Sequence, residues 1–271
     1  MAKRVGYWAT DHTQPQVLER LKKDHGVHWS CTSLRKVLRS LHRGMVPHRR
    51  ASQVDHVVSW LEQARASRGR VRPTLSVGRD GIFVPLLRGV WQEGSTATIS
   101  VVDRRGKRVG TVYLGHMPEP GQGTLTDQLN ALLRDILRRV ESQGLRLVYV
   151  TDEGYHPSDY YHSVLKKMSD PRRPWRRLEW RRIVDFYHAC QYIQKLAETI
   201  FGAGAEAQSW AKQMRRVLKT KADGVSRVLQ SASALWRGRG LCGPTKVFNQ
   251  AYSYIKRRTQ WMRYQTYKRQ Q

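Results

Sequence analysis

The sequence predicts an α+β protein, with a mixed sheet flanked by helices, a helical region before it and an all-helical segment after it. Short runs rich in Val, Ile, Leu and Thr between Pro73 and Phe186 have the alternating or continuous apolar character of strands. On both sides of them, apolar residues recur at the three- and four-residue spacing of amphipathic helices. Asp80, Asp152 and Asp185 each follow one of the apolar runs, and they stand out in a chain of net charge +28.

The first part of the chain is predicted to be helical. Over residues 14–45 an apolar stripe breaks at Gly26 and then resumes, which indicates a helix, a turn and a second helix capped by Ser30 or Thr32. This pattern is typical of a helix-turn-helix that lays its second helix in a DNA groove, and equally of a basic helical hairpin. A separate helix is expected over residues 53–66. The basic residues on the polar side of the second helix are Arg35, Lys36, Arg39 and Arg43.

The predicted sheet follows a basic linker. Residues 74–114 are expected to form an antiparallel meander of three strands, with a turn at Asp80-Gly81 close to its first strand. A helix with an apolar stripe from Leu125 to Val140 comes next. The run Leu145 to Thr151 is apolar on both faces, so we expect it in the centre of the sheet. A helix, an arginine-rich connector and a strand that ends at Asp185 complete this part.

Three domains are predicted from these elements. Residues 1–70 form the helical DNA-binding region, residues 71–201 the sheet-bearing core, and residues 202–271 a helical insertion. The basic linker before Pro73 marks the first boundary, because the pattern changes there from helices to strands. After Gly202 only helical patterns follow.

The composition narrows the choice of partner. Lys and Arg number 49 against 21 Asp and Glu, spread over the whole length, which favours a nucleic acid over membrane lipid or a merely solubilising surface. No apolar run is long enough to span a bilayer, and no signal peptide is recognisable, so we expect a cytoplasmic, nucleoid-associated protein without a membrane partner. The scattered cysteines argue against a disulfide framework or a zinc site. These are Cys31, Cys190 and Cys242.

Two further segments are predicted to contact DNA phosphates. One is the arginine-rich connector, whose charges outnumber the nearby acids; it contains Arg172, Arg173, Arg176 and Arg177. The other is the helical tail, which contributes Arg257 and Arg258 among aromatic residues. In this tail Tyr254, Trp261 and Tyr264 fall on one helical face, which favours packing against a neighbouring helix; stacking on unpaired DNA bases is the alternative.

The order of the core elements is that of the ribonuclease-H-like fold, in which the first and fourth strands are neighbours. Asp80 and Asp152 are therefore expected side by side where these strands end, the edge at which open α/β sheets place their ligands. Two such carboxylates can hold Mg²⁺ or Mn²⁺ for phosphodiester hydrolysis and strand transfer. An Asp-Gly pair seen alone, by contrast, is more often a plain turn.

Three blocks carry a resemblance to a known family: Arg79-Asp80-Gly81, Val150-Thr151-Asp152-Glu153-Gly154 and Asp185-Phe186-Tyr187-His188. They resemble the blocks of bacterial insertion-sequence transposases of the DDE class, Mutator-related and of the ISKra type. The resemblance runs from about Leu18 onward. It implies that Asp80 and Asp152 are the first two catalytic acids and hold the metal, and that Asp185 and His188 form the signature pair before a helical insertion. It also implies double-stranded transposon ends and target DNA as partners, and a homodimer or larger assembly on DNA.

The family's third catalytic acid is a Glu on a helix after the insertion, and the chain departs from the pattern there. From Gly224 to Gln271 it has no Asp or Glu. We therefore expect a truncated transposase with impaired chemistry, and the alternative is a catalytically inactive DNA-binding remnant. A structure-selective ribonuclease or resolvase is disfavoured by the resemblance. His188 is expected either to orient a phosphate or to hydrogen-bond Asp185.

Overall fold

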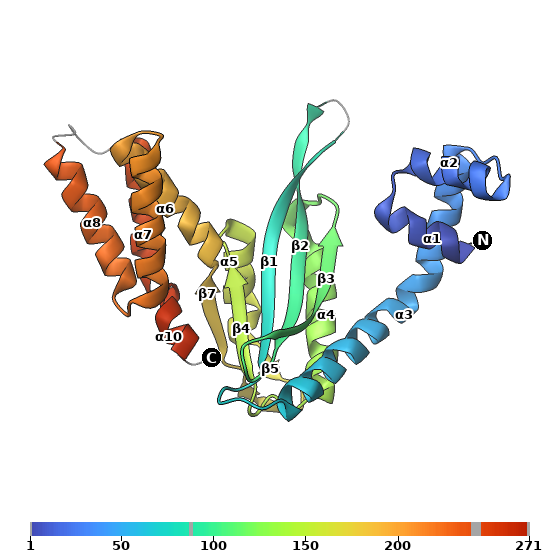
Figure 1. The fold of residues 1–271 in the computed structure, drawn as a ribbon. Coiled ribbons are helices and arrows are strands. Elements are labelled where there is room, and N and C mark those ends of the chain that lie inside the picture. The colour runs from blue at the N-terminus through green and yellow to red at the C-terminus, as the bar shows by residue number, and fades with distance from the viewer. Residues whose placement is uncertain (1, 87–88, 240–244, 270–271) are drawn as a thin grey trace. The chain divides into compact units, whose positions relative to one another are not determined.

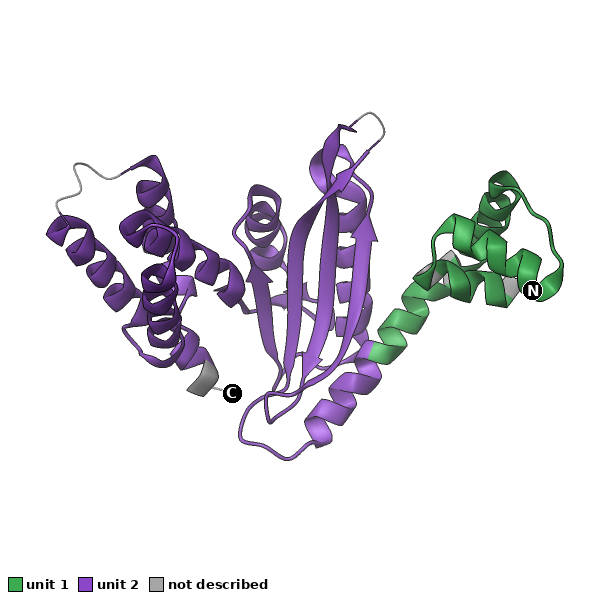
Figure 2. Cartoon of the chain, turned by 45° about the horizontal axis from the view of Figure 1, so that its top comes forward, with its two compact units in different colours: residues 1–56 green, residues 57–271 purple. Residues whose placement is uncertain are grey.

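The structure, a computed structural model, describes residues 2–86, 89–239 and 245–269. They form two compact units, Met1–His56 and Val57–Gln271 (Figure 2). The boundary lies inside α3 (Cys31–Ala66), which is one continuous helix. The prediction of two separate helices here was wrong, because the polar residues between the two apolar stripes are helical as well. Their described side chains are exposed, so the segment needs no apolar face.

The first unit contains α1 (Ala2–Asp11), α2 (Gln14–His25) and the start of α3. Gly26 ends α2 in the left-handed conformation, with φ 63°, which glycine adopts without strain. The Ser33 N–H donates to the Ser30 hydroxyl oxygen at 3.1 Å, which confirms Ser30 as the helix cap. The predicted helix, glycine turn and helix are thus present, and α1, which the sequence reading missed, contributes Val5 to their common core.

The second unit is built on a mixed five-stranded sheet in the order β3-β2-β1-β4-β7 (Figure 1). Its strands are β1 (Thr74–Pro85), β2 (Trp91–Val102), β3 (Arg108–His116), β4 (Arg146–Thr151) and β7 (Trp180–Val184). β2 pairs antiparallel with β1 and with β3, whereas β4 pairs parallel with β1 and with β7. The predicted α+β class, the three-stranded meander and the neighbouring first and fourth strands are confirmed.

The predicted turn at Asp80-Gly81 was wrong. β1 continues through both residues to Pro85, and Asp80 pairs with Thr96 of β2. β2 begins at Trp91, so the backbone groups of β1 beyond Asp80 have ladder partners there. At position 81 a Cβ would meet only the Glu93 side chain, which would have to move aside.

Helices and a short hairpin complete this part of the unit. After η2 (Pro120–Gln122) comes α4 (Gly123–Arg139), whose predicted apolar stripe is buried from Leu125 onward. The single helix expected before the arginine-rich connector is instead α5 (Tyr155–Ser163) followed by η3 (Leu165–Lys167). The arginine-rich connector forms a second, two-stranded sheet of β5 (Ser169–Asp170) and β6 (Arg173–Arg177).

The last part is helical, as predicted. It contains α6 (Phe186–Phe201), α7 (Ala205–Thr220), α8 (Gly224–Gly238), α9 (Lys246–Arg257), η4 (Thr259–Trp261) and α10 (Tyr264–Arg269). Their apolar faces share a core that reaches Val184 at the end of β7. Cys190 is buried in α6, and Cys242 lies outside the described residues. Within the described parts of the chain, no helix is long and apolar enough to cross a membrane.

Candidate active site

Asp80, Asp152 and Asp185 lie in one row across three neighbouring parallel strands. The last registered pair of β1 and β4 is Arg79 with Thr151, and the last pair of β4 and β7 is Thr151 with Val184. Asp80 is the next residue of β1, and Asp152 and Asp185 directly follow the ends of β4 and β7. Because parallel neighbours are about 4.8 Å apart, the row spans about 10 Å from Asp80 to Asp185.

The other two acids and His188 are close enough to influence the charge of Asp80. Desolvation of the Asp80 carboxyl raises its pKa, and the negative charges of Asp152 and Asp185 raise it further. The backbone N–H of Gly81, which donates to Asp80 Oδ1 at 2.8 Å, and the nearby His188 act in the opposite direction. The other three residues predicted as catalytic therefore all act on the charge of Asp80.

Asp152 is held by a tight turn after β4. Its Oδ1 accepts a hydrogen bond of 2.9 Å from the backbone N–H of Gly154. Between them, Glu153 adopts a left-handed conformation with φ 70°, which is rare for a residue with a side chain. A Cβ at Gly154 would lie 3.2 Å from Asp152 Oδ1, so a larger residue there would press on the carboxylate. The backbone thus sets the orientation of Asp152.

The turn is anchored by a buried ion pair that sequence reasoning missed. The side chains of Arg182 in β7 and Glu153 are only 1% and 3% exposed, and they form a bidentate salt bridge. The other Arg182 contacts are the hydroxyl of Ser158, the ring of His162 and the faces of Tyr161 and Trp261. Burial raises the pKa of Glu153, while Arg182 draws it down. No distinctive local signal marks the pair, because Arg182 directly follows Arg181 in β7, at the end of an arginine-rich stretch of the sequence.

Asp185 serves as the cap of α6. Its Oδ2 accepts a 2.9 Å hydrogen bond from the backbone N–H of His188, and its own N–H donates to the Thr151 carbonyl at 2.8 Å. The His188 ring packs edge-on against Tyr192 and Tyr254. The expected hydrogen bond between His188 and Asp185 is therefore present, but it is made by the backbone of His188.

The helical segment docks on the ends of the strands through tyrosines. The Tyr254 hydroxyl donates to the Asp152 carbonyl at 2.7 Å, and the Tyr264 hydroxyl donates to the Val184 carbonyl at 3.0 Å. The Tyr254 ring stacks on Tyr192, with centroids 3.6 Å apart. Trp261 lies against Arg182. The packing interpretation of this aromatic face is confirmed, and it places the segment beside the acids.

A basic groove of about 940 Å³ adjoins this contact. Its walls come from α6 and α9, and its charged lining residues are Lys195, Lys246, Arg257 and Arg258. Two rings, Tyr192 and Tyr254, also line it. Arg257 is exposed, whereas the Arg258 guanidinium lies 4.0 Å from the Tyr254 ring centroid and its Nε is 3.9 Å from Glu153. Both predicted arginines thus line the groove, and Arg258 lies beside the turn that follows Asp152.

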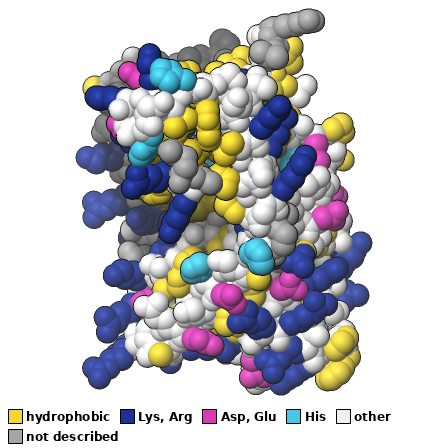
Figure 3. Space-filling view, turned by 90° about the vertical axis from the view of Figure 1, so that its right-hand side faces the viewer, with side chains coloured by type: hydrophobic (Ala, Val, Ile, Leu, Met, Phe, Trp, Pro, Cys, Tyr) yellow, Lys and Arg dark blue, Asp and Glu magenta, His cyan; other side chains and the backbone are white. Residues whose placement is uncertain are grey.

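The other predicted DNA-binding residues lie elsewhere. Arg35, Lys36, Arg39 and Arg43 are exposed on α3 of the first unit, where the Arg35 Nε also donates to Gln14. In the connector, Arg173 pairs with Glu141 at 2.9 Å, and the Arg172, Arg176 and Arg177 side chains are exposed. Figure 3 shows that Lys and Arg side chains are spread over one face of the molecule, with Asp and Glu scattered among them.

Among the described residues, no three His, Cys, Asp or Glu side chains form a group that could hold a metal ion. The donors at the row are carboxylates in a sheet edge, and two of them are tied to backbone N–H groups through Oδ1 alone. Neither the family-model comparison nor the search of curated proteins found a match for the chain.

Proposed function

We propose that the protein is a DNA transposase of the DDE class with a ribonuclease-H-like core, as the sequence resemblance implies. The observation that supports this most is the row of Asp80, Asp152 and Asp185 across β1, β4 and β7. The strand order and the parallel pairing of β1 with β4 are those expected for such a core. Carboxylates on adjacent strands, in a protein of net charge +28, suit chemistry on a polyanion.

The acids at the row fit a Mg²⁺ or Mn²⁺ ion. Asp80 and Asp152 each use Oδ1 for a backbone hydrogen bond, and the Oδ2 atoms receive no hydrogen bond from the described residues. Mg²⁺ favours oxygen ligands and is commonly held by one or two carboxylates together with water and substrate phosphate. When bound, the metal would supply an activated water or 3′ hydroxyl and charge compensation at the leaving oxygen.

The chain's own residues orient these acids and bring DNA to them. The Glu153–Arg182 pair fixes the turn that aims Asp152, and Asp185 sets the start of α6 and thereby the position of His188. Arg257 and Lys246 in the neighbouring groove would contact phosphates on either side of the scissile bond. The basic side of α3 would bind the transposon ends, with a homodimer or larger assembly forming on DNA in the nucleoid.

The test is cleavage of supercoiled plasmid and of a labelled duplex from the DNA that flanks the gene, with Mg²⁺ or Mn²⁺. We expect nicking by the wild type, and its loss in Asp80→Asn and Asp152→Asn. Asp127→Asn, an identical change at an exposed position of α4, is the control and retains activity. Nicking that survives both active-site substitutions contradicts the proposal.

A second candidate is DNA binding without cleavage. It is favoured by the finding that, in the part of the chain that the structure describes, no group of three potential ligands surrounds the row. This candidate predicts that the wild type binds the same duplexes but nicks none of them with either metal. Binding of wild type and Asp80→Asn would then be equal.

A further inference from the structure

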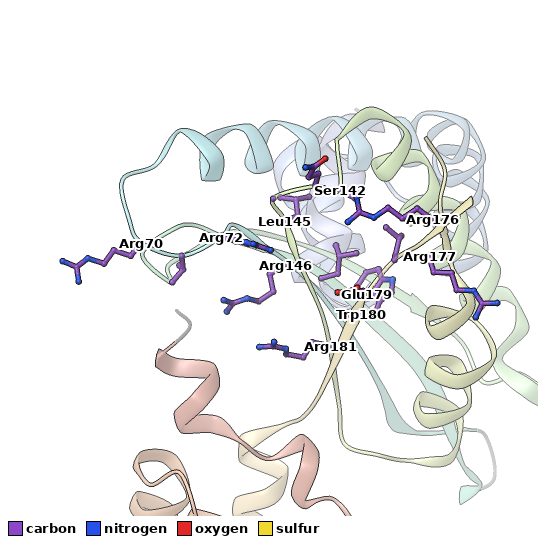
Figure 4. Close-up of a pocket in the computed structure, with 15 residues that line it drawn as sticks. Arg70, Arg72, Ser142, Leu145, Arg146, Arg176, Arg177, Glu179, Trp180 and Arg181 are labelled. Carbon is purple, nitrogen blue, oxygen red and sulfur yellow. The ribbon is translucent and has the colours of Figure 1, made fainter. Parts of the chain in front are cut away.

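A second basic groove lies at the opposite end of the parallel strands from the acids. Its volume is about 1100 Å³, and it is formed by the segment before β1, the starts of β4 and β7, and β6 (Figure 4). The charged side chains of its lining are six arginines against one glutamate. They are Arg70, Arg72, Arg146, Arg176, Arg177, Arg181 and Glu179.

The register of the sheet separates this groove from the candidate active site. Arg146 pairs with Thr74 at the start of β1, and Arg181 pairs with Val148 near the start of β4. The acids lie just beyond the last registered pairs of the same strands, Arg79 with Thr151 and Thr151 with Val184. Because β4 has six residues, each advancing about 3.3 Å, the two ends of this strand are about 20 Å apart. A phosphate held in this groove is therefore not the one positioned at Asp80 and Asp152.

The guanidinium groups in the groove are crowded. Arg146 and Arg181 extend from neighbouring strands to the same side (Figure 4). Partial burial lowers the pKa of Arg146, and the positive charges of Arg181 and Arg72 lower it further. An anion bound there would relieve this repulsion. In the groove wall, the indole N–H of the buried Trp180 meets no acceptor among the described residues.

The basic surface continues beyond the groove. A smaller hollow of about 330 Å³ shares Arg70, Arg72 and Gly144 with it, and adds Arg65 and Arg104. A single phosphate group cannot neutralise so many guanidinium groups, whereas duplex DNA presents one charge per about 1.7 Å of its axis. The large apolar side chains that line the groove, such as Leu147 and Leu178, are buried, so the groove itself offers no apolar group to insert into a bilayer.

We propose that this groove binds the backbone of a second segment of duplex DNA, away from the segment that is cut. The inference rests on the proposed function for the identity of the polyanion, but its binding site is separate from the acids. In a transposase, holding DNA at both ends of the strands would add affinity and fix the path of the duplex without contributing to the chemical step.

The test compares pairs of charge-removing variants that each lower the net charge by two. Arg146→Gln with Arg181→Gln alters the groove, and Lys212→Gln with Arg216→Gln, both exposed on α7, is the matched control. Binding of a labelled duplex of about 30 base pairs is measured against salt, in EDTA. We expect the groove pair to lose roughly tenfold or more in affinity and to reduce the salt slope by about 1.8, from 0.9 per lost phosphate contact. The control pair should change both quantities far less.

Two additions keep the result interpretable. Arg70→Gln with Arg72→Gln removes charges from the segment before β1, where no strand can be disrupted, and should weaken binding similarly. Nicking at saturating DNA should be unchanged in the groove variants. If the wild type does not nick at all, the proposed function fails, but the binding measurement in EDTA still shows whether the groove binds DNA. The inference is overturned if both groove pairs bind DNA like the control pair, or if they lose binding only to phosphatidylserine vesicles.

Discussion

The hydroxyl of Tyr254 donates a 2.7 Å hydrogen bond to the backbone carbonyl of Asp152, a residue 102 positions earlier in the chain. This bond joins α9 to the turn that carries a candidate metal ligand. The ring of Tyr254 is stacked on Tyr192 and lies beneath the Arg258 guanidinium, so the hydroxyl has little freedom to move. Burial raises the Tyr254 pKa, which keeps the hydroxyl protonated and able to donate.

Tyr254→Phe tests this link. The substitution keeps the stacked ring and removes only the hydroxyl, so we expect a loss of about 1 kcal/mol in the free energy of unfolding, together with slower nicking. Urea denaturation and plasmid nicking measure the two effects. Tyr252→Phe, the same change two residues earlier on α9, is the control. Equal behaviour of the two variants would show that the bond to Asp152 does not orient the turn.

The buried pair of Arg182 and Glu153 gives a prediction about stability. Arg182→Met leaves the Glu153 carboxylate buried without its partner, which should cost about 3–5 kcal/mol of unfolding free energy. Adding Glu153→Gln should recover a large part of this loss, and urea denaturation of the double-mutant cycle measures the coupling. Arg227→Met breaks the exposed pair with Asp223 and should have no measurable effect. A loss below 1 kcal/mol in Arg182→Met would contradict the arrangement.

Two substitutions separate the roles of Asp185. Asp185→Ala removes the cap of α6 and should cost about 1 kcal/mol of stability, whereas Asp185→Asn keeps an oxygen for the His188 N–H. The Asn variant should therefore melt like the wild type. It loses the charge near Asp80, so we expect metal affinity to fall about 10- to 100-fold, as measured by the metal dependence of nicking. If nicking by Asp185→Asn depends on metal as in the wild type, Asp185 acts only as the cap of α6.

The raised pKa of Asp80 predicts a pH-dependent effect on stability. Because the pKa in the folded protein is above the unfolded value, ionising Asp80 destabilises the fold. The penalty is complete above the folded pKa and disappears below the unfolded pKa. In metal-free buffer at neutral pH, Asp80→Asn should raise the melting temperature by about 1–2 °C, a small change because the carboxyl is partly open to water. The gain should shrink as the pH falls through the raised pKa.

Metal should reverse the order of the melting temperatures of the wild type and Asp80→Asn. A bound ion stabilises only the form that holds it, so adding Mn²⁺ should raise the melting temperature of the wild type more than that of Asp80→Asn. Asp127→Asn, measured in the same series, should follow the wild type at every pH and metal concentration. If Asp80→Asn responds to Mn²⁺ like the wild type, Asp80 is not a ligand.

Much of the sheet could be predicted because its signals are local. The alternation in β2 and β3 and the apolar run of β4 are visible in short windows, and their order then indicates which strands are neighbours. The length of β1 was not predictable in this way. Asp80-Gly81 has the composition of a turn, and only pairing with the early residues of β2 keeps it in a strand.

The candidate site was only partly predictable for the same reason. The aspartates stand out because they follow apolar runs. The Glu153–Arg182 pair joins residues 29 apart in the sequence, and the Tyr254 contact joins residues 102 apart. No local sequence pattern therefore predicts either contact. The aromatic face of the tail was recognised as a packing surface, but its partner, the carbonyl at the end of β4, follows only from the tertiary structure.

The continuity of β1 through Asp80 has a consequence for folding fidelity. Arg79 and Asp80 are consecutive in one strand, and the first is buried while the second is exposed at the row of acids. A slip of β1 by a single residue would bring the guanidinium to the place of the carboxylate. The ladders to β2 and β4 on its two sides therefore do more than hold the sheet together, because correct strand pairing decides whether this edge attracts a cation or repels it.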